Sequence, residues 1–212
     1  MNILIAAVGG QGAVLASRIL GKMAQNSGLD VKVSEVHGMS QRGGSVVTYV
    51  RFGEKINSPI IEKGTADIIL AFEMLEGVRY VEWLKQGGIL ITSRQRIDPM
   101  PVITGASGYP ENLEERLYNL PIHYKTIDAN TYAEEAGSQK TVNVVLIGAL
   151  AAAMDMEKEI WHNAIKEALP EKLLEINLKA FEIGYEKSSC HDAVKNDLCF
   201  QQESRADVFA YN

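Results

Sequence analysis

The fold is decided by the stretch Ile3-Leu-Ile-Ala-Ala-Val8-Gly-Gly-Gln-Gly12, an apolar run that ends in a glycine turn. A short run without any charge is typical of a strand that helices cover on both faces, as in a parallel sheet. Apolar residues at helical spacing follow it and stop at Gly28, which is a natural end for a helix. The stretch therefore predicts an α/β fold with three layers, in which helices flank a mostly parallel, Rossmann-like sheet.

A second glycine-rich turn lies one strand further along the chain. We expect a strand over 31–36, then the polar loop His37-Gly-Met-Ser-Gln-Arg-Gly-Gly44, and then a strand over 46–52. Both glycine turns should lie at the carboxyl ends of the strands that precede them. Open α/β sheets bind their ligands at that edge, so we expect a ligand site there.

The pattern continues as a second β-α-β unit. It predicts a strand over 67–72, a helix over 73–86 that ends at Gly87-Gly88, and a strand over 89–92. Pro59-Ile-Ile is expected as a short edge strand. The remaining expectations are a surface excursion (93–112), a strand (123–128) and helices (113–120, 129–136, 144–154, 157–168 and 171–187).

Length and charge narrow the class of protein. The 212 residues suit one domain, which we place at 1–187, followed by a polar C-terminal tail at 188–212. The net charge of −6 argues against a nucleic-acid partner, which usually requires a basic surface. No apolar run approaches the roughly 18 residues that span a bilayer, and no basic region precedes the first apolar run. We therefore expect no membrane partner and a cytoplasmic location.

The two cysteines, Cys190 and Cys199, both lie in the tail. Two are too few for a disulfide framework, and their spacing with His191 matches no zinc pattern. An iron–sulfur cluster needs a run of four cysteines, which this sequence does not contain. We expect no metal site in the chain.

The first glycine turn has two interpretations. Ala7-Val-Gly-Gly-Gln-Gly12 is one step from a dinucleotide-binding fingerprint, and Glu35 lies at roughly the distance expected for a ribose-binding acid. Glycines let phosphate oxygens approach the backbone, and a helix N-terminus presents free N–H groups. Alternatively, Gly9, Gly10 and Gly12 only allow the helix to pack closely on its strand. The motif alone leaves both interpretations open.

The loop at 37–44 carries a single strong charge, Arg42. Ser40 precedes it and Gly43 and Gly44 follow it, so the loop could present a guanidinium and glycine N–H groups to a phosphate or carboxylate. The alternative is a tight turn whose arginine pairs with a local carboxylate such as Glu35.

Four other polar residues have simpler explanations. His37 has no partner nearby in the sequence, so we assign it no role as a base. Glu73 begins a helix, where an acid is already favoured by the helix dipole. Thr141 and Asn143 open an apolar helix and are expected to cap it.

With these residues in view, the chain resembles the gamma-type domain of the 2-oxoacid:ferredoxin oxidoreductases. The resemblance is strongest to the small (beta) subunits of the indolepyruvate:ferredoxin oxidoreductases. It rests on Gly9-Gly-Gln-Gly12 combined with Ser34-Glu-Val-His-Gly-Met-Ser-Gln-Arg-Gly-Gly-Ser-Val46, and it extends over Met1–Lys187. Thr141-x-Asn143 and Gly148-Ala-Leu150 fit the same pattern, which the chain departs from at Ala7, where glycine is common.

The resemblance implies a chemistry that this chain cannot perform by itself. Enzymes of the family oxidatively decarboxylate a 2-oxoacid on thiamine diphosphate and pass electrons through iron–sulfur clusters to ferredoxin, yielding an acyl-CoA. This chain has no Gly-Asp-Gly followed by paired asparagines, the thiamine diphosphate motif, and no cluster cysteines. The resemblance therefore implies no catalytic residue here and a large partner subunit that carries thiamine diphosphate and the clusters.

The gamma-type domain of the family packs on the catalytic domains and is implicated in coenzyme A access. The resemblance thus implies that the two glycine turns bind coenzyme A phosphates or form the subunit interface: Gly9, Gly10, Gln11, Gly12, Ser40, Arg42, Gly43 and Gly44. Ferredoxin would be reached only through the complex. The isolated chain would be inactive, with an apolar surface that favours self-association. The competing interpretations are a stand-alone NAD(P)-dependent oxidoreductase and an interaction module without a ligand.

Overall fold

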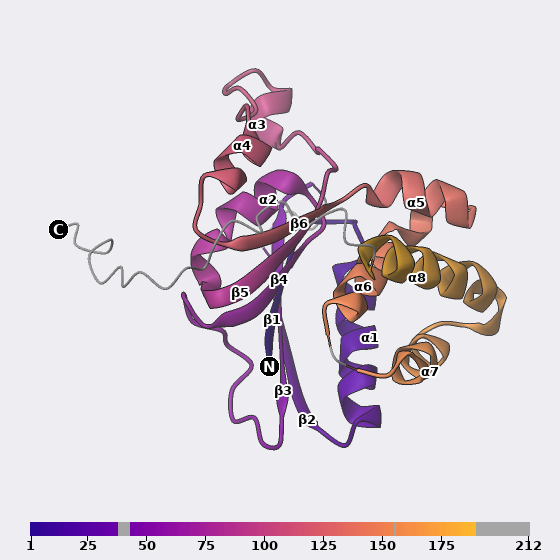
Figure 1. The fold of residues 1–212 in the computed structure, drawn as a ribbon. Coiled ribbons are helices and arrows are strands. Elements are labelled where there is room, and N and C mark those ends of the chain that lie inside the picture. The colour runs from indigo at the N-terminus through magenta and orange to yellow at the C-terminus, as the bar shows by residue number, and fades with distance from the viewer. Residues whose placement is uncertain (38–42, 155, 190–212) are drawn as a thin grey trace.

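A six-stranded sheet runs through the middle of the molecule in the order β2-β3-β1-β4-β5-β6 (Figure 1). The computed structural model describes residues 1–37, 43–154 and 156–189. The strands are β1 (Asn2–Val8), β2 (Asp30–His37), β3 (Ser45–Gly53), β4 (Ala66–Ala71), β5 (Leu84–Ser93) and β6 (His123–Ile127). Each coincides with a predicted strand, although β5 begins at Leu84 rather than at Ile89.

One strand runs against the others. β1 pairs in parallel with β4, β4 with β5, and β5 with β6, whereas β3 pairs antiparallel with both β1 and β2. The connection at 38–44 is too short for the helical crossover that parallel neighbours require, so β3 must return antiparallel beside β2. The predicted α/β sheet is confirmed, with β3 inserted between β1 and β2.

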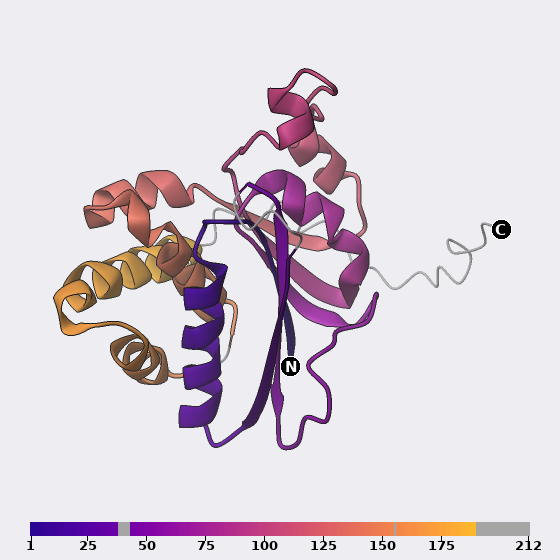
Figure 2. The same cartoon turned by 180° about the vertical axis from the view of Figure 1, so that it is seen from behind.

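Helices cover both faces of the sheet (Figure 2). On one face lie α1 (Ala13–Asn26), α5 (Ala129–Ala136), α6 (Val142–Ala152), α7 (Lys158–Ala168) and α8 (Leu174–Ser189); on the other lie α2 (Met74–Arg79) and α4 (Leu113–Tyr118), with α3 (Met100–Ile103) beyond them. Side chains of β1 alternate between the two cores: Ile3 and Ile5 pack toward α1, while Leu4 and Ala6 pack toward α2. All four are fully buried, as the apolar run predicts.

Two predicted elements are wrong. The helix expected over 73–86 ends at Arg79, and a single 3₁₀ turn at Val81–Trp83 leads directly into β5. Gly87 and Gly88, which were expected to end the helix, lie within β5, where a Cβ on Gly88 would come within 2.9 Å of the Asp67 carbonyl oxygen. The segment at 59–61, expected as an edge strand, is irregular. The Arg51 guanidinium donates to the backbone carbonyl oxygens of Ser58 and Ile60, both at 2.9 Å.

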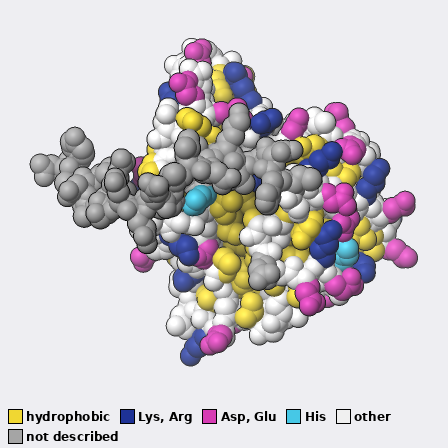
Figure 3. Space-filling model, in the orientation of Figure 1, with side chains coloured by type: hydrophobic (Ala, Val, Ile, Leu, Met, Phe, Trp, Pro, Cys, Tyr) yellow, Lys and Arg dark blue, Asp and Glu magenta, His cyan; other side chains and the backbone are white. Residues whose placement is uncertain are grey.

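On the face that Figure 3 shows, charged and hydrophobic side chains gather in different places. Charged side chains gather over α7 and α8, whereas hydrophobic side chains form a band between these helices and the sheet (Figure 3). In the part of the chain that the structure describes, no helix is both long enough and apolar enough to cross a membrane.

Helices α6 and α8 cross with almost no space between their backbones. A Cβ placed on Gly148 would lie 2.2 Å from the Phe181 carbonyl oxygen, and one on Gly184 would lie 2.1 Å from the Val145 carbonyl oxygen. Neither position can accept a side chain unless the helices separate. This close crossing is the physical reason for glycine at 148 within an otherwise apolar helix.

We expect Gly148→Ala to lower the free energy of unfolding by about 3 kcal/mol, because the added methyl group overpacks the crossing. Gly21→Ala is the matched control, since its Cβ would meet nothing within 4 Å on α1. Alanine there should raise the free energy of unfolding by about 0.5–1 kcal/mol. Urea unfolding of both variants measures these changes. Equal stability of the two variants would show that the crossing is not tight.

Candidate functional site

The turn after β1 and the end of the β2–β3 loop are joined by their backbones. Gly9 N–H donates to the Gly44 carbonyl oxygen at 2.8 Å, and Gly43 N–H donates to the Gly9 carbonyl oxygen at 3.2 Å. We call Gly9–Gly12 together with Gly43–Gly44 the glycine cradle. The structure thus brings together six of the eight predicted site residues, while Ser40 and Arg42 lie outside the described residues.

The glycine cradle opens into a cavity of about 350 Å³. Its lining consists of Val8, Gly9, Gly10, Gly12, Ala13, Val14, Glu35 and Val46. Helix α1 begins at this cavity with Gly12 in the left-handed conformation, and its first turn contains no acidic residue. The N–H groups of such a first turn have no partners within the helix and favour an anion. The cavity can therefore hold a phosphate group through backbone donors.

Glu35 lines the same cavity, but not in the arrangement of a dinucleotide site. In the Rossmann fold the second strand lies directly beside the first. Here β3 separates β2 from β1, so Glu35 lies two strand spacings, about 10 Å, from β1. The sequence distance that suggested a ribose-binding acid therefore does not correspond to the spatial arrangement of that site.

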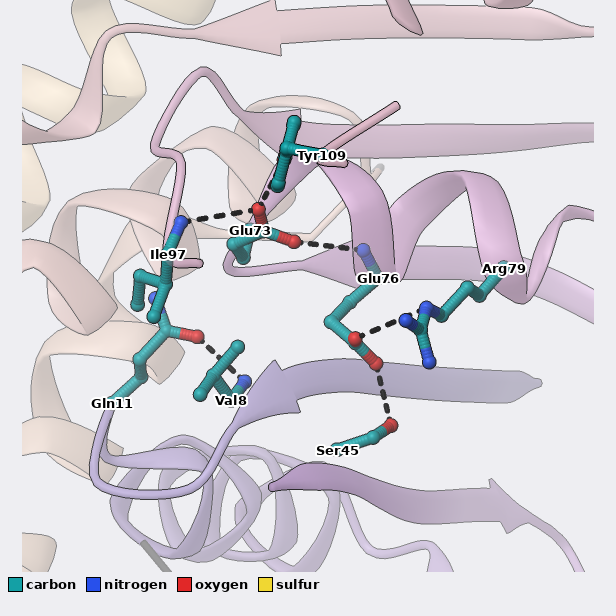
Figure 4. A network of polar contacts seen from close by, with 8 residues as sticks. All are labelled: Val8, Gln11, Ser45, Glu73, Glu76, Arg79, Ile97 and Tyr109. Atoms are coloured by element: carbon teal, nitrogen blue, oxygen red, sulfur yellow. Dashed lines mark hydrogen bonds and ion pairs between the residues drawn. The ribbon is translucent and has the colours of Figure 1, made fainter. Parts of the chain in front are cut away.

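The Gln11 side chain bonds back to the end of β1 (Figure 4). Its Oε1 accepts from Val8 N–H at 2.7 Å, and its Nε2 donates to the Phe72 carbonyl oxygen and to Gln95 Oε1, both at 2.9 Å. The side-chain amide is thus used in holding the end of β1 to the ends of β4 and β5. These bonds give Gln11 a structural role in the turn, and its part in ligand binding stays a prediction.

Asn143 reaches the glycine cradle from α6. Its Nδ2 donates to the Gly12 carbonyl oxygen at 3.3 Å, and a Cβ on Gly12 would lie 2.5 Å from that nitrogen. Gly12 also has φ +86°, which L side chains rarely adopt. Thr141 stands at the N-cap position of α6, as predicted, although its hydroxyl donates to the Ser138 carbonyl oxygen and does not accept from the helix. Asn143 Oδ1 accepts from Val144 N–H at 3.0 Å in the first turn, while Asn143 Nδ2 connects α6 to the cradle.

Glu73 is the centre of a polar network that the sequence did not reveal (Figure 4). It is 1% exposed, caps α2 by accepting from Glu76 N–H at 2.9 Å, and accepts from Tyr109 Oη–H at 2.6 Å and from Ile97 N–H at 3.3 Å. Burial and the Glu73 hydrogen bond raise the pKa of Tyr109. Glu73 therefore anchors the excursion that follows β5. The expectation of an acid at the start of this helix is confirmed, but its long-range partners were not predictable from spacing.

A second buried carboxylate, Glu76, lies beneath the start of β3. It is 4% exposed and accepts from Ser45 Oγ–H at 2.5 Å, and the Arg79 guanidinium lies 3.5 Å from its other oxygen. Burial raises the pKa of the Glu76 carboxyl group, while Ser45 and Arg79 act in the opposite direction. Glu76 joins α2, on one face of the sheet, to the residue that follows the glycine cradle.

A larger cavity, of about 1120 Å³, lies beside α4 and contains Arg94 and Arg96. Both guanidiniums already have partners: Arg94 pairs with Glu114 at 3.2 Å, and Arg96 pairs with Asp98 at 2.7 Å and covers the Tyr109 ring. The smaller cavity, by contrast, lies at the start of α1, where the first-turn N–H groups have no partners within the helix, and we regard it as the better ligand site. Within the described ranges, no cluster of three His, Cys, Asp or Glu side chains could hold a metal ion, and Cys190 and Cys199 lie outside them.

Comparisons with known proteins agree on one group. The profile of the pyruvate ferredoxin/flavodoxin oxidoreductase family matches residues 2–187. Indolepyruvate oxidoreductase subunit IorB of Thermococcus kodakarensis is 42% identical over 86% of this chain and 93% of its own length. The keto/oxoacid ferredoxin oxidoreductase gamma subunit of Geobacter sulfurreducens superimposes with a TM-score of 0.66 at 25% identity, covering 88% of this chain and 97% of that one.

A second solved structure shows the same fold inside a longer chain. The 2-oxoglutarate:ferredoxin oxidoreductase of Magnetococcus marinus matches with a TM-score of 0.67 and 20% identity, over 89% of this chain but only 31% of that chain. The fold described here therefore occurs both as a separate chain and as one part of a larger one.

The buried Glu76 should make stability depend on pH. Because folding raises the pKa of the Glu76 carboxyl group, the folded chain binds a proton there more readily than the unfolded chain. The free energy of unfolding therefore falls as pH rises from the unfolded to the folded pKa of Glu76. Glu76→Gln cannot ionise. We therefore expect the free energy of unfolding of the variant, relative to that of the unmodified chain, to increase when the pH is raised from about 4 to about 7. Urea unfolding at both pH values measures this difference, and a difference that does not change with pH would contradict it.

Proposed function

Because the chain belongs to the pyruvate ferredoxin/flavodoxin oxidoreductase family, we propose that it is the small, non-catalytic subunit of an indolepyruvate (arylpyruvate):ferredoxin oxidoreductase. Membership of the indolepyruvate/2-oxoacid:ferredoxin oxidoreductase group rests on identities of 35–43% to four IorB subunits, each over most of the chain. In the proposed complex a 2-oxoacid loses CO₂, its acyl group passes to coenzyme A, and two electrons pass to ferredoxin.

The sequence suggests how the reaction is divided between this chain and its partner subunit. With two cysteines and no thiamine diphosphate motif, the chain has no residues for the redox chemistry. That chemistry is assigned to a larger partner subunit that carries thiamine diphosphate and the iron–sulfur clusters. The role of this chain is then to bind the partner and to contribute to coenzyme A binding.

The backbone hydrogen bonds between Gly9 and Gly43–Gly44 are the observation that carries the proposed coenzyme A site. They place two glycine turns and the start of α1 around one cavity, which suits a phosphate group of coenzyme A. Ala7, where glycine is common in the family, does not obstruct the cavity. Its methyl group is fully buried in the core beneath α1.

The stand-alone NAD(P)-dependent oxidoreductase is not favoured. The relatives are named as subunits of oxoacid oxidoreductases, and β3 displaces β2 from the position beside β1 that a dinucleotide site needs. Saturable quenching of tryptophan fluorescence by NADH, without an effect of coenzyme A, would reverse this preference.

Exposed apolar side chains support a role in assembly. Val14 and Val36 are about half exposed near the glycine cradle, and Met100 and Ile103 are more exposed still on α3. Subunit interfaces are enriched in such residues at their centres. We therefore propose that the partner covers exposed apolar side chains of this kind, and that the isolated chain self-associates through them.

We expect the isolated chain to be colourless and inactive. Purified protein mixed with indolepyruvate, coenzyme A and a viologen dye should give no dye reduction, because the chain has no thiamine motif and no cluster cysteines. Addition of the large partner subunit should produce reduction that depends on coenzyme A. Turnover by the chain alone would refute its assignment as a non-catalytic subunit.

Arg42, adjacent in sequence to the glycine cradle, should matter more than any other single charge. A hydrogen bond to a charged group contributes roughly 1.5–3 kcal/mol, so Arg42→Ala should raise the KM for coenzyme A of the assembled enzyme about ten- to a hundred-fold. Arg42→Lys should recover only part of this, since an ammonium lacks the planar fork. Arg18→Ala, at an exposed position on α1, is the matched control.

The amount of partner that co-purifies with Arg42→Ala separates the two proposed roles. Reduced co-purification with an unchanged KM would assign Arg42 to the subunit interface. If neither quantity changes, Arg42 has no part in the site.

A further inference from the structure

We propose that Glu76 is a positioning residue for the glycine cradle and that it acts through Ser45. The predicted effect of Glu76 on coenzyme A binding rests on the proposed function. Its predicted effect on the geometry of the cradle does not. It assigns a role to a buried carboxylate on α2 that no part of the proposed reaction uses.

The connection from Glu76 to the cradle is short and continuous. Ser45 is the first residue of β3, directly after Gly43–Gly44, and its backbone lies opposite Val8 at the end of β1. Its side chain donates to Glu76 Oε2 at 2.5 Å. The adjacent Gly44 carbonyl oxygen accepts from Gly9 N–H at 2.8 Å. A shift of Ser45 would therefore move Gly43–Gly44 relative to the turn after β1.

Glu76 is itself held firmly enough to serve as an anchor. Glu73 caps the helix through Glu76 N–H at 2.9 Å, which fixes the backbone at this position. At the next residue, a Cβ on Gly77 would lie 3.1 Å from both Ala71 Cβ and Thr92 Oγ1, so α2 lies close against β4 and β5. The anchor for the cradle is thus a helix packed on the opposite face of the sheet from α1 (Figure 2).

Stability alone does not explain a carboxylate at this position. Removal of a carboxylate from water is unfavourable, and the Arg79 guanidinium that partly compensates it is 3.5 Å away and about half exposed. An amide could accept the same hydrogen bond without a buried charge. A carboxylate, however, accepts a hydroxyl hydrogen more strongly than a neutral group does. The charge therefore serves the contact with Ser45, and through it the geometry of the cradle.

The direct test is hydrogen exchange at the Gly9 and Gly43 amides of the full chain, measured by NMR in Glu76→Ala, Ser45→Ala and the double variant. Each single change should accelerate exchange at these two amides about ten-fold relative to amides of β4 and β5. The double variant should show no further acceleration, since both changes break the same hydrogen bond. Glu76→Gln should give an intermediate rate. Glu82→Gln is the control: it replaces an exposed carboxylate elsewhere on the surface and should not accelerate exchange at these amides.

Three results would overturn the proposal: unchanged exchange at Gly9 and Gly43, acceleration by Glu76→Ala but not by Ser45→Ala, or a uniform acceleration over the whole sheet. The last would show a structural role only.

A second measurement distinguishes this proposal from the proposed function. In the complex with the large subunit, Glu76→Ala and Ser45→Ala should raise the KM for coenzyme A several-fold while kcat stays within about two-fold, with Glu76→Gln in between. If exchange at the cradle accelerates but the KM stays constant, Glu76 positions the cradle and coenzyme A is not its ligand. In that case the proposed coenzyme A site at the cradle fails and the positioning role stands.

Discussion

The arrangement of the whole site depends on two backbone hydrogen bonds, between Gly9 and the pair Gly43–Gly44. They exist because the chain returns directly from β2 into β3, and β3 then takes the place beside β1 that β2 occupies in a Rossmann fold. The end of the β2–β3 loop is thereby brought to the turn after β1. Glycine at these positions lets the two backbones approach without side chains between them.

The turn after β1 is also held from other sides. Gln11 attaches it to the ends of β4 and β5, Asn143 attaches it to α6, and Glu76 holds the start of β3 from α2. Every layer of the fold thus contributes to the geometry of the glycine cradle. A preorganised backbone site of this kind can bind an anion without ordering mobile groups, which suits the binding role that we propose for this chain.

Local signals in the sequence were enough to predict the six strands and the two glycine turns, because β1 and its turn are set by a short apolar run and adjacent glycines. Contacts between residues that are distant in the sequence could not be predicted in this way. The helix over 73–86 was overestimated because the pairing of Leu84 with Ala66, which draws this segment into β5, cannot be read from spacing. The same holds for Gly148 with Phe181 and for Ser45 with Glu76, whose partners lie far apart in sequence. The bonds of Gln11 to residues that follow β4 and β5 were likewise not predictable from the sequence, because these partners are far from the turn in the chain.

The central claim is that the glycine cradle binds a phosphate group of coenzyme A in the assembled enzyme. Hydrogen–deuterium exchange of the complex with and without saturating coenzyme A tests it most directly. Our interpretation predicts slower exchange in two segments when coenzyme A is bound. The amides at 12–15, at the start of α1, would donate to the phosphate. The amides of Gly9 and Gly43 already form the hydrogen bonds that join the two turns, and binding would make those bonds open less often. Unchanged exchange in both segments, in an enzyme whose turnover shows that coenzyme A is bound, would contradict the claim.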